Sequence, residues 1–157
     1  MNALVPRNAL FGLSALAPVP APPPGWALVE RRFDRLFQGI AVTDAAFKDG
    51  ITKASRITRT LNRIYWPLGS AEPKGILAGS WGKWTRIHPS ADLDLLYVLP
   101  PEVYWRYEAR TGNRQSDLLQ EIKGHLAPTY PNTALRGDGQ VLVVNCASIT
   151  VEVVPVF

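Results

Sequence analysis

Acidic residues inside an apolar strand pattern are the feature that most limits what this chain can fold into. Asp92 and Asp94 alternate with Leu93 and Leu95 at the start of a predicted strand over residues 92–99. Successive side chains on a strand point to opposite faces, so both carboxylates share one face while the leucines enter the core. Like charges held this close repel unless a cation lies between them. The pattern predicts a sheet with one buried face and one face that holds a divalent cation.

A third carboxylate lies far downstream in a second apolar run. Glu152 is flanked by valines in a predicted strand over residues 149–154. A buried charge there is costly without a partner, and a metal shared with the two aspartates would provide one. Oxygen ligands select Mg²⁺ or Mn²⁺, and two such ions can activate a hydroxyl and stabilise a leaving pyrophosphate. We therefore predict Asp92, Asp94 and Glu152 as catalytic ligands of two ions.

A Gly-Ser pair precedes the aspartates by eleven intervening residues. Gly79 would let the backbone approach a phosphate, and successive N–H groups there can bind an anion. The Ser80 hydroxyl can donate to a phosphate oxygen, and Lys83 and Arg86 add positive charge. We predict these four residues as a phosphate site. Each motif alone has a plainer explanation as a turn, a solvated strand end or an exposed edge position, but their order favours the catalytic interpretation.

Hydrophobic periodicity predicts an α+β domain in which a mixed β-sheet is flanked by helices, one of them long and N-terminal. The predicted helices cover residues 26–39, 44–65 and 115–126. The predicted strands cover residues 75–78, 92–99, 141–146 and 149–154, the last two as a hairpin. Thr43 or Asp44 is expected to cap the long helix.

Two of these helices carry apolar stripes. The first stripe consists of Leu28, Val29, Phe33, Leu36 and Phe37. The second, which we expect to be buried, consists of Ala54, Ile57, Leu61 and Ile64. Lys53, Arg56 and Arg63 lie on another side of the long helix and are interpreted as a solvated face rather than as a contact for a nucleic-acid activator. Trp81 and Trp84 are expected to pack in the core or against a missing C-terminal half rather than to stack on a base.

Composition sets the domain boundaries and the compartment. Residues 1–25 are predicted to be a flexible tail rich in proline and alanine, and residues 26–157 the catalytic core. The start of the tail only weakly resembles a signal peptide. Cys146 is the single cysteine, which excludes an internal disulfide and favours the cytoplasm. No run of about 20 apolar residues predicts a membrane span. The net charge of +4 favours anionic partners.

The spacing of these motifs resembles a known superfamily. Gly79-Ser80, followed after eleven residues by Asp92-Leu-Asp94, resembles the signature of the DNA polymerase β-like nucleotidyltransferases. The long gap before Glu152 is similar to the cyclic GMP-AMP synthase and oligoadenylate synthetase branch. Further stretches resemble the bacterial CD-NTases, and the resemblance covers residues 26–157. These stretches are residues 61–66, 90–96, 130–133, 138–141 and 151–155.

The resemblance implies both a chemistry and a biological role. A 3′- or 2′-hydroxyl of one nucleotide attacks the α-phosphate of an NTP and releases pyrophosphate, giving cyclic or short linear oligonucleotide second messengers in anti-phage defence. It implies that Ser80 contacts donor phosphates and that Asp92, Asp94 and Glu152 hold the metals. It also implies a helical C-terminal half, absent from this sequence, that walls the nucleotide pocket. We therefore expect the isolated chain to bind Mg²⁺-NTP weakly and turn over slowly without that half or a partner chain.

Two other functions remain open from the sequence. One is a linear nucleotidyltransferase that adds nucleotides to RNA or protein. The other is a non-catalytic nucleotide-binding or interaction module left by truncation. Products from labelled NTPs would separate these, because cyclic products resist phosphatase, linear products do not, and a binding module gives neither.

Overall fold

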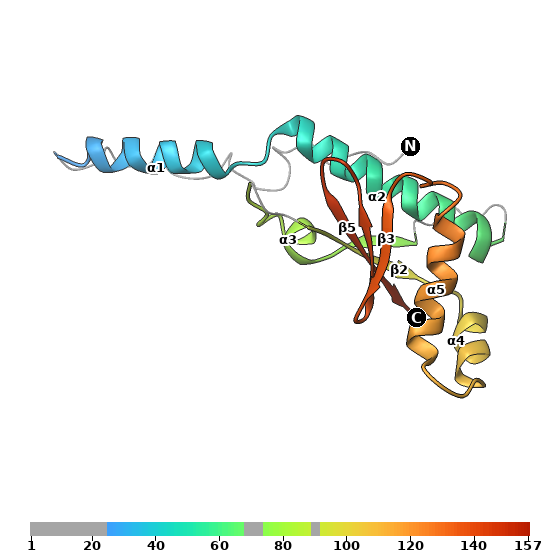
Figure 1. The fold of residues 1–157 in the computed structure, drawn as a ribbon. Helices are drawn as coiled ribbons and strands as arrows, with labels where there is room; N and C mark the ends of the chain where they lie inside the picture. Colours follow the sequence, from blue (N-terminus) through green and yellow to red (C-terminus); the bar gives the residue numbers. More distant parts are fainter. Residues whose placement is uncertain (1–24, 68–73, 89–91) are drawn as a thin grey trace. The chain divides into compact units, whose positions relative to one another are not determined.

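The computed structural model describes residues 25–67, 74–88 and 92–157. The predicted tail, apart from Gly25, and the predicted loop ending at Pro73 lie outside these ranges. The chain divides into two units, of which the first ends at Gln38 and the second spans Gly39–Phe157 (Figure 1). The boundary predicted at residue 25 stays a prediction.

Helix α1, Ala27–Ile40, matches the first predicted helix (blue in Figure 1). None of its residues is buried. The side chains of its apolar stripe are between 39% and 60% exposed, and the rings of Phe33 and Phe37 lie 6.3 Å apart. The apolar period therefore predicts the helix correctly, but the apolar side chains of α1 are not buried.

A five-stranded mixed sheet forms the centre of the second unit, in the order β1-β2-β5-β4-β3. The strands are β1 (Gly75–Leu77), β2 (Leu93–Val98), β3 (Ala134–Asp138), β4 (Val141–Asn145) and β5 (Thr150–Val156). β2 and β5 pair in parallel, and the other neighbours pair antiparallel. The predicted mixed α+β architecture and the predicted β4–β5 hairpin are confirmed.

Helices cover one face of this sheet. They are α2 (Asp44–Tyr65) and α5 (Arg114–Leu126), which lie beside the strands in Figure 1, while α4 (Pro101–Glu108) packs against α5. Alternate residues of β2 and β5 enter the core against Ile57 and Leu61 of α2 and Ile122 and Leu126 of α5, all fully buried. The Thr43 hydroxyl caps α2 by accepting a hydrogen bond from the Ala46 N–H at 3.2 Å, as predicted.

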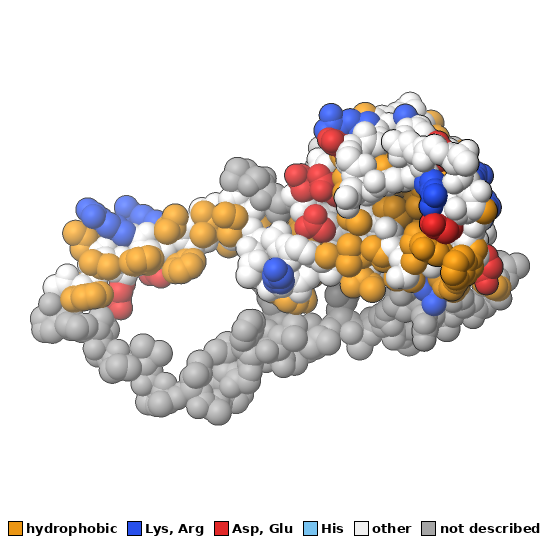
Figure 2. All heavy atoms as spheres, turned by 90° about the horizontal axis from the view of Figure 1, so that it is seen from below, with side chains coloured by type: hydrophobic (Ala, Val, Ile, Leu, Met, Phe, Trp, Pro, Cys, Tyr) orange, Lys and Arg blue, Asp and Glu red, His pale blue; other side chains and the backbone are white. Residues whose placement is uncertain are grey.

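The opposite face of the sheet is partly exposed. Burial along β2 alternates strictly, so that Asp94, Leu96 and Val98 point away from the helices. Ile76 on β1 is 51% exposed. Seen from below, the second unit presents acidic side chains beside a broad apolar area (Figure 2). This open face is where the predicted chemistry would take place.

The structure corrects or extends the sequence prediction in three places. Ile64 is 44% exposed, so its assignment to the buried stripe was wrong; the helical period brings Tyr65 to the core instead. Helix α4 was not predicted, because Pro100 and Pro101 suggested only a strand end, yet Pro101 occupies the first turn, where proline is favoured. Strand β3 was also not predicted; it precedes the expected turn, where Gly139 has φ +59°.

Candidate active site

Parallel pairing of β2 with β5 brings two of the predicted carboxylates to adjacent positions. Asp94 and Glu152 are register partners, 58 positions apart in the chain. Paired residues on neighbouring strands project to the same side, with strands about 4.8 Å apart. Asp92 lies two residues before Asp94 and is exposed. All three residues therefore lie at the amino ends of β2 and β5, and the alternation of side chains puts them on the open face.

Electrostatics indicate that these carboxylates interact. Burial raises the pKa of Glu152, and the negative charges of Asp92, Asp94 and Asp138 raise it further, while Arg136 opposes them. The described residues nevertheless include no group of three or more His, Cys, Asp or Glu side chains arranged to hold a metal ion. The donor chemistry fits a hard divalent cation, whose charge would relieve the repulsion. The three predicted ligands thus lie on one face of the sheet, but they do not form a metal-coordinating arrangement.

Gly79 lies directly against Asp94. The N–H of Ala78 donates to the Asp94 carbonyl at 2.9 Å, which fixes the chain beside β2. Gly79 then adopts φ +53°, and a Cβ there would overlap the Asp94 carboxylate. The sequence predicts that this glycine admits a phosphate. Its observed contact shows that the missing side chain first makes room for the carboxylate.

Ser80 and Lys83 belong to a tight turn that follows. Helix α3, Gly79–Gly82, makes one turn, and the Lys83 N–H donates to the Gly79 carbonyl at 3.1 Å. The Ser80 carbonyl accepts from the Thr85 N–H at 3.0 Å. Ser80 is half-buried and Lys83 is exposed. Their predicted phosphate contacts stay predictions, as does that of Arg86.

Arg86 lies in an aromatic cluster formed by Phe47, Trp81 and Trp84. Its guanidinium carbon is 4.2 Å from the Phe47 ring centroid and 5.0 Å from each tryptophan centroid. Trp81 is 3% exposed, as expected of a core residue, whereas Trp84 is 48% exposed. Core packing therefore holds for Trp81 but not for Trp84, for which the expected contact with the missing C-terminal half stays a prediction. Sequence spacing alone could not distinguish the two rings.

A family model described as the Second Messenger Oligonucleotide or Dinucleotide Synthetase domain matches residues 28–157. The chain belongs to this family. The resemblance to bacterial CD-NTases is thereby confirmed. A comparison with curated proteins finds no match.

Solved structures show the same fold. The E. coli MS115-1 CdnC:HORMA-deltaN complex is similar with a TM-score of 0.54 and 18% identity, over 80% of this chain and 40% of that chain. Cid1, described by its RNA terminal uridylyl transferase activity, gives a TM-score of 0.54 and 14% identity, over 82% of this chain and 35% of that one. This synthetase-domain chain thus has the nucleotidyltransferase fold. It spans less than half the length of either structure.

The basic face of α2 in this synthetase-domain chain is partly engaged. Lys53 bonds to Asp49 and to Ser148 in the β4–β5 loop. The Arg56 guanidinium lies 5.3 Å from the centroid of the Tyr130 ring. Arg63 is exposed. Two of the three cations predicted to be solvated therefore make intramolecular contacts, so the simple picture of a solvated face is incomplete.

A carboxylate outside the predicted site joins three helices. Glu121 on α5 accepts hydrogen bonds from the hydroxyls of Tyr65 (2.9 Å) and Tyr107 (2.8 Å) and from the Arg106 guanidinium (2.6 Å). Burial acts to raise the pKa of Glu121, but these donors outweigh it and hold the pKa below its usual value. Sequence reasoning missed this network because its partners are distant in the chain and carry no motif.

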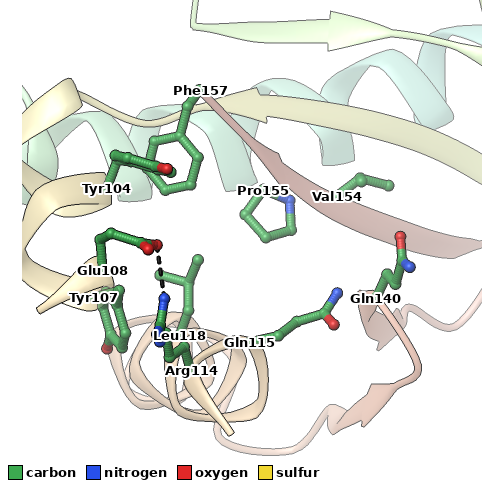
Figure 3. A pocket seen from close by; sticks show the side chains of 10 residues that line it. All are labelled: Tyr104, Tyr107, Glu108, Arg114, Gln115, Leu118, Gln140, Val154, Pro155 and Phe157. Atoms are coloured by element: carbon green, nitrogen blue, oxygen red, sulfur yellow. Dashed lines mark ion pairs between the residues drawn. The ribbon is translucent and has the colours of Figure 1, made fainter. Parts of the chain in front are cut away.

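A cavity of about 230 Å³ lies toward the carboxyl end of β5 (Figure 3). Tyr104 and Phe157 meet edge to face at its rim, with ring centroids 5.3 Å apart. Glu108 and Arg114 form an ion pair of 2.8 Å beside it. The three predicted carboxylates do not line this cavity. None of the described helices combines the length and apolar character that a membrane crossing requires.

Proposed function

We propose that this chain is the catalytic core of a metal-dependent nucleotidyltransferase that joins NTPs into cyclic or short linear oligonucleotide second messengers. The observation that carries the proposal is the parallel β2–β5 pairing, which makes Asp94 and Glu152 register partners beside the Gly-Ser turn. Membership of the second-messenger synthetase family supports the product class. A cytoplasmic role in anti-phage defence is part of the same proposal.

In this proposal, Asp92, Asp94 and Glu152 would hold two Mg²⁺ or Mn²⁺ ions. Such ions supply Lewis acidity for attack of a hydroxyl on an α-phosphate and for departure of pyrophosphate. The chain itself provides position and charge. Ser80 would donate its hydroxyl to a donor phosphate oxygen, and Lys83 would add a positive charge that neutralises the triphosphate.

In this proposal, the acidic face makes NTP binding depend on a cation. A triphosphate approaching three neighbouring carboxylates is repelled unless divalent ions neutralise them. The raised pKa of Glu152 supports this, since its causes include the two aspartates. Metal binding should therefore precede or accompany nucleotide binding.

A metal-binding measurement tests the site even if turnover is slow. We expect an Asp92→Asn, Asp94→Asn double variant to lower Mn²⁺ affinity at least about 10-fold by calorimetry, and to reduce pyrophosphate release at least about 100-fold. Asp138→Asn is the matched control, because Asp138 adds negative charge near Glu152 but is not a predicted ligand. Equal Mn²⁺ affinity in the double variant and in the native chain would contradict the metal assignment.

A linear transferase is the second candidate, favoured by the similarity to Cid1. Products formed from labelled NTPs with Mg²⁺ distinguish the two. Phosphatase-resistant products support the cyclic reaction. Phosphatase-sensitive oligonucleotides made from NTPs alone support the short linear messenger, and label joined to an added RNA acceptor supports the linear transferase. Mn²⁺ and NTP binding without any product, even after addition of a complementing chain, would indicate a binding module.

A further inference from the structure

Trp84 adopts a backbone conformation that suits glycine. Its φ of +61° lies in the left-handed region, which bulky side chains rarely adopt and which persists where the surroundings or a function require it. The indole is nevertheless 48% exposed, whereas Trp81 three residues earlier fills the core. A glycine or asparagine would satisfy this turn without strain. The core therefore does not account for a tryptophan at position 84.

One aromatic ring and one guanidinium pack near the exposed indole of Trp84. Phe47 of α2 lies 5.4 Å away between ring centroids, and the Arg86 guanidinium lies 5.0 Å from the indole centroid. Lys83, the residue before Trp84, is exposed. An oriented aromatic ring with neighbouring cations is the arrangement by which proteins stack on a base while attracting its phosphates.

The ring also lies close in the chain to the candidate active site. Trp84 lies in a turn that is closed by the hydrogen bond from the Thr85 N–H to the Ser80 carbonyl. This bond holds the turn against the predicted phosphate-binding segment. Gly79, at the start of that segment, contacts Asp94. A nucleotide whose phosphates lie at this turn would have an aromatic surface beside it.

We propose that Trp84, supported by Phe47 and Arg86, is a stacking platform for a nucleobase. This inference rests on the proposed function, because it takes a nucleotide as the ligand. The base belongs either to a mononucleotide substrate or to an oligonucleotide at the same site. Both sources share the chemistry of a flat ring attached to an anionic phosphate.

Trp84→Gly tests the platform in the full chain with Mg²⁺ present. Affinities are measured by calorimetry for ATP, for a 5′-phosphorylated adenine dinucleotide, and for tripolyphosphate, which has no base. We expect affinity for at least one of the two adenine ligands to fall about 10-fold, while that for tripolyphosphate is unchanged. A loss with ATP assigns the platform to a substrate base, and a loss with the dinucleotide alone assigns it to an oligonucleotide.

Two further variants control for a loss of affinity that is caused by misfolding. Trp84→Phe should retain most of the affinity, because it keeps an aromatic face. Trp105→Ala removes another exposed tryptophan, on α4, and should leave all three affinities unchanged. Equal losses for tripolyphosphate and the adenine ligands, unchanged affinities in Trp84→Gly, or no binding of either adenine ligand to the native chain would each overturn the proposal.

Failure of this inference is distinguishable from failure of the proposed function. If Trp84→Gly binds ATP and the dinucleotide normally while the Asp92→Asn, Asp94→Asn variant loses Mn²⁺ and activity, the platform is wrong and the transferase stands. If base binding depends on Trp84 but no transfer occurs with a complementing chain, the platform stands without the chemistry.

Discussion

Gly79 and Gly139 share a backbone conformation but differ in their surroundings. Their φ angles are +53° and +59°, so a side chain is strained at either position. A Cβ on Gly79 would overlap the Asp94 carboxylate, whereas nothing lies within 4 Å of a Cβ on Gly139. Alanine substitutions at the two positions therefore separate backbone strain from disturbance of the carboxylate.

We predict that Gly79→Ala and Gly139→Ala each lower the free energy of unfolding by about 1 kcal/mol. Only Gly79→Ala should also displace Asp94, and a displacement of about 1 Å costs about 100-fold in rate. Urea unfolding and pyrophosphate release measure the two effects. Equal activities in the two variants would show that the contact between Gly79 and Asp94 has no catalytic consequence.

Glu152 is a second residue at which the proposed function conflicts with stability. Its raised pKa means that the ionised form is disfavoured in the folded chain, so the destabilisation is present at pH values above that pKa. Replacing the carboxylate with a neutral amide should remove this destabilisation.

We predict that Glu152→Gln raises the melting temperature of the metal-free chain at pH 7 by roughly 2–4 °C. The same variant should lose most of the stabilisation that Mn²⁺ gives the native chain. Thermal melts with and without Mn²⁺ measure both effects. A lower melting temperature without metal would mean that the ionised carboxylate is favourably paired.

At the scale of elements, the contact between α2 and α3 depends on a buried glycine. Gly50 lies in the middle of α2, and a Cβ there would overlap the indole of Trp81. Gly124 on α5 is also helical, yet nothing lies within 4 Å of a Cβ built on it. Alanine has a higher helix propensity than glycine at both positions.

Gly124→Ala should therefore raise the free energy of unfolding by about 0.5–1 kcal/mol. Gly50→Ala should lower it by about 1–3 kcal/mol, because overpacking against Trp81 outweighs the gain in propensity. Chemical denaturation of both variants tests the opposite signs. Stabilisation by Gly50→Ala would show that Trp81 moves aside freely.

Sequence patterns predicted the elements better than the contacts between them. Periodicity located α1, α2 and α5 and the strands β1, β2, β4 and β5, since each of them has an apolar repeat of its own. Strand β3 has little such repeat, because its residues are mostly exposed. Helix α4 begins at a proline that also suits the end of a strand, so local signals could not decide between the two.

The candidate site was predictable in its residue types but not in its pairing. Alternation put Asp92 and Asp94 on one face. No local signal specifies that Asp94 faces Glu152, because register between distant strands is set by the whole sheet. The same limit applies to Arg86. Its charge predicted a phosphate contact, but no local signal specifies that its guanidinium lies against three aromatic rings.

At the scale of the second unit, Glu121 connects α2, α4 and α5 through Tyr65, Arg106 and Tyr107. A carboxyl pKa held below its usual value stabilises the folded chain above the pKa of the unfolded state. That stabilisation is lost as the pH falls through the folded-state pKa. Acid should therefore weaken the hydrogen-bonded contact between these helices and lower the free energy of unfolding.

We predict that Glu121→Gln lowers the free energy of unfolding by about 2 kcal/mol at pH 7, and that the difference from the native chain shrinks below about pH 4. Glu108→Gln is the matched control, because the Glu108–Arg114 ion pair is exposed and worth at most about 1 kcal/mol. Urea unfolding at several pH values tests this. A difference independent of pH would contradict a contribution from the ionised carboxylate.

The central place of β5 has a consequence for the order of events during synthesis. This strand lies between β2 and β4, which both precede it in the chain. The chain must therefore be synthesised through β5 before the sheet can close, and contacts of such long sequence separation form slowly. Until then β2 has an unpaired edge and Asp94 has no Glu152 beside it. Under the proposed function, the nascent polypeptide therefore lacks its complete set of carboxylates until β5 has paired with β2.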